Sequence, residues 1–373
     1  MKIYMNHLSW NVGKSTDVKV RETFKILEGI YPDINFYYPH SKLQSLLPNI
    51  KRVILGILRR LSCIEVRYDY LLKFEKLANI KEFRKGTYDI VYTQGNFPKN
   101  IPFDTPVFFD SFLIEPEQTE ACYDEKSQEY FELTKERLGI IANRKCLINL
   151  RSDYSVNLAK KLYPSVSEKF VNIPFLLPSL KAISDEKLIN KHNNDAIIKI
   201  LFTGAQAKRK GLDLLINALN SLYDRGYKKW ELIVVSSMDD GKIDIPNFLP
   251  IRLMGELAYN DVLKLAKECH FYAMISLSES FGLSYIEAEA NGCIPLARDF
   301  EPQREIVDYG RVGFLAKPSV SDISAKLEIM FEMSRDERIE MALEAKKYFL
   351  RNYEFSIVAN LWYDAFVKIE KMI

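Results

Sequence analysis

The segment from residue 271 to residue 297 constrains the fold of this chain more than any other part of the sequence. Two apolar runs, Phe271–Ile275 and Cys293–Ala297, each have the pattern of a buried strand. Between them lie a glycine turn at Gly282 and a helical pattern that ends at Gly292. Strand, helix and strand in this order predict a parallel βαβ unit, because parallel strands need a crossover connection.

The same rhythm continues over most of the chain and predicts an α/β fold with parallel sheets covered on both faces. Further strands are expected at 2–5, 89–92, 107–109, 146–149 and 170–173, and again at 197–202, 231–235 and 251–254. The stretch from 178 to 196 is polar and rich in lysine, asparagine and serine, which is typical of a linker. Two doubly wound domains are therefore expected.

Composition narrows the class of protein. The chain has 373 residues and a net charge of +2, which argues against a dedicated nucleic-acid binder. Its five cysteines are scattered and form no CxxC pair, so a zinc site or disulfide framework is not expected. The first residues lack the apolar core of a signal peptide, and no run approaches the roughly 20 apolar residues of a membrane span. These features favour a cytoplasmic protein.

Two glutamates mark the expected site. Glu279 follows the strand at 271–275, and Glu287 lies inside the next helix. The loops at the carboxyl ends of parallel strands are where an open α/β sheet binds ligands. The backbone amides of Phe281, Gly282 and Leu283 open the helix and offer an anion site. A phosphate between two carboxylates that grip hydroxyl groups indicates a sugar nucleotide.

Glu289 shares this helix but has no partner in the pattern, and we interpret it as ordinary surface.

Two other loops join the pattern. Gly204 ends a strand and is followed by a basic loop that contains Arg209 and Lys210. Cations there can neutralise a diphosphate leaving group, although a solvated basic turn has the same sequence. Gly255 ends a further strand, two residues before Leu257, and lets backbone approach a ligand; a tight turn is the simpler explanation.

With these motifs in order, the segment 197–353 resembles the donor-binding domain of glycosyltransferase family 4, retaining enzymes of the GT-B fold. The resemblance implies that Glu279 contacts the donor sugar and Glu287 the ribose. It implies that Lys210 contacts the diphosphate, and that the amides of 281–283 hold phosphate and sugar. The loop 254–257 would line the nucleobase.

The resemblance also implies an organisation. An acceptor-side domain would comprise 1–178, with a C-terminal helix at 354–373 crossing back to it, and 179–196 would link it to the donor domain 197–353. One departure is Ala205, where the family often has arginine. Arg209 is a candidate to supply the missing charge.

The same resemblance implies the reaction. A sugar would move from a nucleotide donor to a glycan or lipid-linked acceptor in cell-surface polysaccharide, lipopolysaccharide or glycolipid synthesis. No aspartate cluster suited to a metal occurs in the sequence, so fixed cations and amides are expected to stabilise the departing diphosphate, with no cofactor beyond the nucleotide sugar. Same-face attack is favoured over a double displacement, because no first-domain nucleophile is obvious.

The first domain is harder to interpret. Gly13 and Lys14 resemble the end of a P-loop, but the glycine that this motif needs five residues earlier is Leu8. We instead expect Gly13, Lys14 and Gln94 to lie on loops that face the interdomain cleft. Asp110, at another strand end, is a candidate catalytic carboxylate, and a turn cap is equally consistent with its position. The spacings support no Ser-His-Asp or Cys-His hydrolase.

The segment 41–86 carries an excess of basic residues. Within it, residues 43–61 have the pattern of a basic amphipathic helix, which can lie on an anionic membrane or pack on the sheet with a solvated basic face. Two alternatives to a transferase stay open: another GT-B sugar-nucleotide enzyme, such as an epimerase or phosphorylase, and a non-catalytic nucleotide-sugar or glycan-binding subunit.

Overall fold

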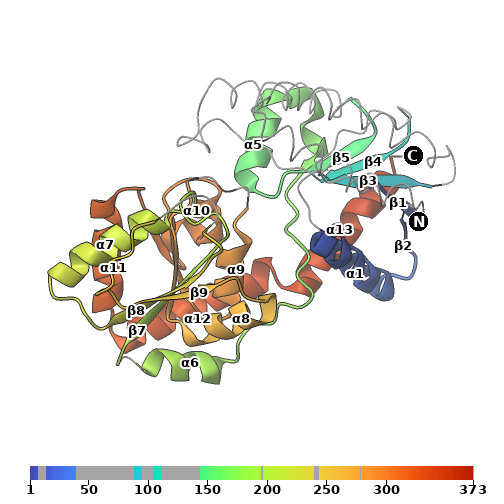
Figure 1. The fold of residues 1–373 in the computed structure, drawn as a ribbon. Coiled ribbons are helices and arrows are strands. Elements are labelled where there is room, and N and C mark those ends of the chain that lie inside the picture. Colours follow the sequence, from blue (N-terminus) through green and yellow to red (C-terminus); the bar gives the residue numbers. More distant parts are fainter. Residues whose placement is uncertain are drawn as a thin grey trace, which may run out of the picture.

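The computed structural model describes residues 1–6, 14–38, 88–94, 104–110, 143–194, 196–238, 243–277, 279 and 281–372; the side chains of 6, 14–21 and 94 are not part of this description. Within these residues the chain forms two six-stranded sheets (Figure 1). All strand pairs in both sheets are parallel. The expected α/β class is therefore confirmed.

The first sheet has the order β2-β1-β3-β4-β5-β6. Its strands are β1 (Lys2–Asn6), β2 (Asn35–Tyr37), β3 (Ile90–Gln94), β4 (Val107–Asp110), β5 (Cys146–Asn149) and β6 (Phe170–Val171). Its helices are α1 (Lys14–Ile30), α5 (Asp153–Leu162) and the 3₁₀ helix η2 (Pro164–Lys169). Alternation along β1 sends Ile3 and Met5 to the core beneath α1, and Tyr4 to the core beneath α5.

The second sheet has the order β12-β11-β10-β7-β8-β9. Its strands are β7 (Ile198–Thr203), β8 (Trp230–Val235), β9 (Ile251–Gly255), β10 (Phe271–Met274), β11 (Ile294–Arg298) and β12 (Phe314–Ala316). The helices around it are α6 (Asp185–Asn193), α7 (Leu212–Asp224), α8 (Tyr259–Glu268), α9 (Leu283–Ala290), α10 (Gln303–Ile306), η3 (Asp308–Gly310), α11 (Val320–Glu332) and α12 (Arg335–Asn352).

Every strand expected from the sequence is present, with ends within about two residues of those expected, as is usual for element boundaries. The strands β2 and β12 were not expected. Each has only three residues, which is too short to show a hydrophobic period.

The stretch 179–196, expected as a linker, contains a helix. Helix α6 begins after the N-cap Ser184 and packs against α12 of the second sheet. Leu188 and His192 on α6 are fully buried, and His192 Nε2 lies 2.8 Å from the carbonyl oxygen of Gly292. The part that remains extended runs from about residue 172 to the start of α6.

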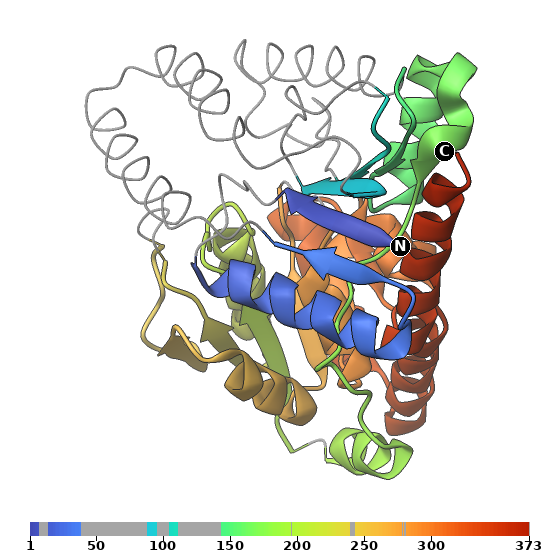
Figure 2. The ribbon, with the colours of Figure 1, turned by 90° about the vertical axis from the view of Figure 1, so that its right-hand side faces the viewer.

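The last helix, α13 (Phe355–Glu370), crosses back to the first sheet, as the resemblance implied (Figures 1 and 2). Trp362 and Phe366 are buried in the same core as Ile3, Phe24 and Phe108. The indole N–H of Trp362 also donates to the carbonyl oxygen of Pro174, 3.0 Å away. The amphipathic pattern of aromatic residues near the C-terminus is therefore explained by packing in the first domain.

Among the described residues, no helix is both long and apolar enough to span a bilayer. The basic segments 41–86 and 43–61 lie outside the described residues.

Candidate active site

A pocket of about 340 Å³ lies where the strand order of the second sheet reverses, between β7 and β10. Crevices at such a reversal, outside the carboxyl ends of the strands, are the usual ligand sites of open α/β sheets. The loop after β7, the loop after β10 and the start of α9 supply most of its walls. Its lining residues are Phe175, Thr203, Gly204, Lys210, Glu279, Phe281, Gly282, Leu283, Ser284 and Glu287.

Lys210 and Glu279 form an ion pair across this pocket. Lys210 Nζ lies 3.0 Å from Glu279 Oε1, and the two side chains are 16% and 12% exposed. The ammonium group also lies 3.5 Å from the sulfur of Met274 beneath it. The sequence placed both residues at the site, and the structure brings them together at the end of adjacent strands.

Gly204 makes room for Lys210. Its φ is +153°, and a Cβ at this position would lie 2.2 Å from Lys210 Cδ. The aliphatic part of Lys210 therefore runs directly over the Gly204 backbone on its way to Glu279. Glycine is needed here because any side chain would push the lysine away.

The start of α9 forms another wall. Gly282 is the N-cap in a left-handed conformation, with φ 91°. A Cβ at this position would lie 2.8 Å from side-chain atoms of both Ile306 and Tyr285. The first amides of α9 have no partner within the helix, and the helix dipole places partial positive charge beside them. One helical turn further, the side chain of Glu287 forms a hydrogen bond with Tyr259 at the start of α8. Burial, together with the charge of Glu287, raises the pKa of Tyr259.

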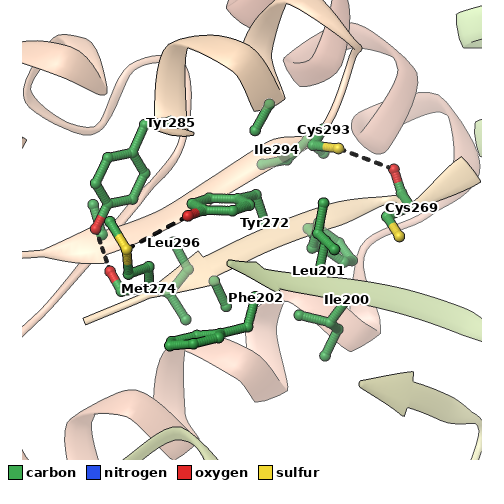
Figure 3. Packing of buried hydrophobic residues seen from close by; sticks show 14 of the residues in the cluster. Ile200, Leu201, Phe202, Cys269, Tyr272, Met274, Tyr285, Cys293, Ile294 and Leu296 are labelled. Carbon is green, nitrogen blue, oxygen red and sulfur yellow. Dashed lines mark hydrogen bonds between the residues drawn. The ribbon is translucent and has the colours of Figure 1, made fainter. Parts of the chain in front are cut away.

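Two tyrosines of the second core, Tyr272 and Tyr285, pack around Met274 next to the pocket residues (Figure 3). Tyr285 donates its hydroxyl hydrogen bond to the carbonyl oxygen of Met274, and the Tyr272 hydroxyl lies 3.4 Å from the Met274 sulfur. Thr203 Oγ1 lies 3.0 Å from the same Tyr272 hydroxyl. Both rings are fully buried, so the strand ends that carry Lys210 and Glu279 rest on a rigid layer.

Three residues expected at the donor site do not line this pocket: Arg209, Gly255 and Leu257. Arg209 Nε donates to Gln206 Oε1 at 2.6 Å, and its carbonyl oxygen accepts from the N–H of Leu277. Gly255 is exposed at the end of β9 with φ 66°, and Leu257 packs partly buried against the second core.

Asp110 is placed differently from what a catalytic carboxylate in a cleft would require. It is 1% exposed, does not line this pocket, and pairs with the guanidinium of Arg151. Tyr92 and Asn149 also donate to it, at 2.8 and 3.1 Å. Burial raises the pKa of Asp110, while Arg151 and these donors oppose that rise.

The other first-domain candidates can be placed only by their backbone. Gln94 ends β3 directly beside Asp110 in the sheet register, and Lys14 is the first residue of α1. Gly13 lies outside the described residues. Gln94 is therefore at the carboxyl edge of the first sheet, as expected, whereas the cleft contacts of Gly13 and Lys14 stay predictions.

Glu289 was wrongly interpreted as surface. It is 0% exposed, and neither carboxylate oxygen has a hydrogen-bond partner among the described residues. Burial raises its pKa well above the usual range, and the nearby charge of Asp308 adds to that rise. The helix α9 is covered by α12 on this side, which the sequence of α9 alone does not reveal.

The sequence also missed Phe175, Thr203 and Ser284 as pocket residues. Phe175 belongs to the extended segment between the sheets, where no periodic pattern marks it, and its ring packs 5.3 Å from that of Phe281. Thr203 and Ser284 flank predicted residues, and their short polar side chains are common in turns.

The two domains also contact each other at the start of α5. The carboxylate of Glu305, from α10, accepts hydrogen bonds from the backbone N–H groups of Asp153 and Tyr154 at the start of α5. Burial raises the pKa of Glu305 to about 7, against the lowering effect of these two donors. An acidic group of the second domain thus caps a helix of the first.

No group of three or more His, Cys, Asp or Glu residues is arranged to hold a metal ion within the described part of the chain. The charges available in the pocket there are the cation of Lys210, the two glutamates and the amide dipoles of α9.

Residues 184–348 match the family model described as "Glycosyl transferases group 1". Most of the second half of the chain is therefore similar to glycosyltransferase group 1 domains. The matched residues include Lys210, Glu279 and Glu287. A 165-residue segment is also 28% identical to an uncharacterized glycosyltransferase of Methanocaldococcus jannaschii, covering 42% of this chain and 44% of that relative.

Solved structures extend the similarity to both domains at low identity. The chain resembles a sucrose-phosphate synthase of Thermosynechococcus elongatus with a TM-score of 0.65 and 12% identity, over 99% of this chain and 98% of that one. It resembles a trehalose-6-phosphate synthase with a TM-score of 0.66 and 10% identity, over 100% of this chain and 99% of that one. It also resembles a glycosyltransferase of Rickettsia africae with a TM-score of 0.59 and 15% identity, over 99% of this chain and 98% of that one. The chain therefore has the GT-B fold.

Proposed function

We propose that this protein is a retaining glycosyltransferase of family 4 that transfers a sugar from a nucleotide-sugar donor. The observation that carries the proposal is the Lys210–Glu279 ion pair in one pocket with Gly282 and Glu287. In this proposal Glu279 binds donor-sugar hydroxyls and Glu287 the ribose. Lys210 and the amides of α9 bind the diphosphate.

The reaction we propose needs no metal. The bond between the anomeric carbon and the diphosphate oxygen breaks, and the electron pair leaves with the diphosphate. The acceptor hydroxyl oxygen bonds to the anomeric carbon on the same face, and its proton passes to the departing phosphate. Lys210 and the α9 amides would stabilise the charge that develops on the leaving group.

Arg209 is proposed as a second cation for the diphosphate, in place of the arginine that Ala205 replaces. Its guanidinium is already held by Gln206, so the donor would have to recruit it. Unchanged donor affinity and turnover in Arg209→Ala would remove it from the site.

For the acceptor we propose a glycan or lipid-linked sugar in cell-surface polysaccharide, lipopolysaccharide or glycolipid synthesis, with the basic segment 43–61 on the inner face of the plasma membrane. Enzymes of similar fold include trehalose-phosphate and sucrose-phosphate synthases, which is consistent with a sugar acceptor. Binding to anionic vesicles at low salt tests the membrane contact, and no binding would exclude it.

The experiment for the central proposal is a screen of UDP- and GDP-linked sugars by thermal shift, followed by turnover of each stabilising donor. A bound donor raises the melting temperature by mass action. Turnover by wild type and loss of turnover in Glu279→Gln are expected. Release of an epimerised sugar, or release that needs phosphate, would identify an epimerase or phosphorylase. Donor binding with no turnover would identify a non-catalytic subunit.

A further inference from the structure

A second pocket, of about 400 Å³, adjoins the first and lies between the two domains. Its walls come from α1, the extended segment 175–180, α13 and the starts of α8 and α9. Phe175, Leu283 and Glu287 line both pockets, so the two cavities share a wall. Most of the remaining lining is apolar, including Ile26, Leu177 and Trp362.

Arg151 is the one cation among the described residues that line this pocket. It follows β5 with a left-handed backbone, φ 69°, which is uncommon for a residue other than glycine. Its side chain is 2% exposed, and its Cζ lies 3.7 Å from the centroid of the Phe175 ring. Strained backbone at a cavity wall is typical of functional positions.

The guanidinium is only partly satisfied. Nη2 pairs with Asp110, which Tyr92 and Asn149 hold in place. Nε and Nη1 are buried and have no hydrogen-bond partner among the described residues. Buried N–H groups without an acceptor are costly, so a ligand oxygen that reached them would be strongly favoured.

Charge decides which kind of oxygen fits. Asp110 already balances Arg151, and the other ionisable carboxylates of the described lining are Glu22 and Glu287. A phosphate or carboxylate would therefore enter a pocket whose described groups carry net negative charge. A hydroxyl oxygen would accept from Arg151 without that repulsion and could donate to a glutamate in turn.

We propose that this pocket binds the acceptor, and that the acceptor is an uncharged, hydroxyl-bearing molecule with an apolar portion, such as a glycoside with an alkyl or lipid aglycone. Its hydroxyl groups would meet Arg151, and its apolar portion would pack on Ile26, Leu177 and Trp362. The position beside Glu287 and Phe175 brings such a molecule next to the donor pocket. This inference rests on the proposed transferase function.

The test is calorimetric binding of hexyl β-glucoside, its 6-phosphate and free glucose to the full chain without a donor. Hexyl glucoside is expected to bind best, and each of the others about tenfold or more weakly, through charge repulsion or loss of apolar contact. Tighter binding of the phosphate would overturn the uncharged acceptor. Absence of saturable glucoside binding would overturn the site.

Variants then locate the bound glucoside. Arg151→Gln alone leaves Asp110 as a buried, uncompensated charge and can unfold the protein, so the double variant Asp110→Asn with Arg151→Gln is the one to use. It is expected to fold, by circular dichroism, and to lose affinity about tenfold. Ile26→Trp, on the exposed face of α1, enlarges a side chain of the apolar pocket wall and should also weaken binding.

Two controls complete the design. Arg351→Gln, on the exposed side of α12, should bind like wild type. Glu279→Gln should also bind hexyl glucoside normally, because Glu279 lines only the donor pocket. If Glu279→Gln abolishes binding while the Asp110 and Arg151 variant does not, the glucoside occupies the donor pocket and the inference is wrong. Because no donor is present, glucoside binding can succeed even where every nucleotide sugar fails.

Discussion

Lys210 and Glu279 pair at 3.0 Å across the point where the second sheet reverses its strand order. The two residues are far apart in sequence, and the pair ties the loop after β7 to the loop after β10. A diphosphate that reaches Lys210 must share the ammonium group with Glu279, while a sugar hydroxyl can donate to the same carboxylate. Under the proposed function, the ion pair would prepare the pocket for both parts of the donor.

Replacing Lys210 with methionine should reduce kcat/KM by about 10²–10³-fold, because the diphosphate loses its fixed cation in the transition state. Steady-state kinetics with the donor found in the screen measure this. Lys208→Met, at an exposed position in the same loop, is the matched control and should change the rate little. Equal losses in both variants would mean that only the general charge of the loop matters.

Gly204→Ala should impair the site without unfolding the domain. The added Cβ would lie 2.2 Å from Lys210 Cδ, and the flexible lysine side chain can move aside, away from Glu279. Donor affinity is expected to fall while the melting temperature changes little. Gly29→Ala in α1 meets no atom within 4 Å and should raise stability by up to about 1 kcal/mol. Unchanged donor affinity in Gly204→Ala would contradict this role of the glycine.

Glu289→Met should stabilise the protein by about 1–3 kcal/mol at neutral pH, because it removes a buried polar group without partners. The gain should grow as the pH rises above the ordinary carboxyl pKa. The unfolded chain then loses its proton while the folded chain keeps it, so wild-type stability falls. Chemical denaturation at pH 5 and pH 8 measures the gain, and the exposed Glu340→Met serves as control. A loss of stability in Glu289→Met would indicate an unrecognised partner.

Glu305→Gln should change the pH dependence of melting. The pKa of Glu305 is raised to about 7, so wild type loses stability as the pH rises from the unfolded value of 4.5 towards 7. The variant lacks this titration, so its melting temperature relative to wild type should improve between pH 5 and pH 8. Glu344→Gln, an exposed carboxylate on α12, should show no such trend. A constant difference between variant and wild type would rule out titration of Glu305 in this range.

The sequence could place several donor-side candidates at one pocket because their features are local. Gly204, Lys210, Gly282 and Glu287 lie at fixed distances from strand ends, and strand ends follow from hydrophobic runs. Once the strands are placed, parallel pairing brings these residues to one edge. The sequence also predicted both sheets for this reason.

What the sequence could not supply depends on packing between distant segments. Glu289 is buried only because α12 covers its side of α9, and Asp110 is buried only because Arg151, Tyr92 and Asn149 surround it. Phe175 lies in a segment without periodicity, yet it contacts Arg151 and both pockets. Such contacts come from the tertiary fold and leave no mark in local spacing.

The crossing of α13 also affects the order in which the chain can fold during its synthesis. Trp362 and Phe366 belong to the core of the first domain, although they follow the second domain in the sequence. Domains usually fold in the order in which they are translated. Here the second domain, whose core runs from Leu180 to Tyr353, can complete that core while the first still lacks part of its own. The first domain must therefore wait, partly exposed, until α13 has been synthesised.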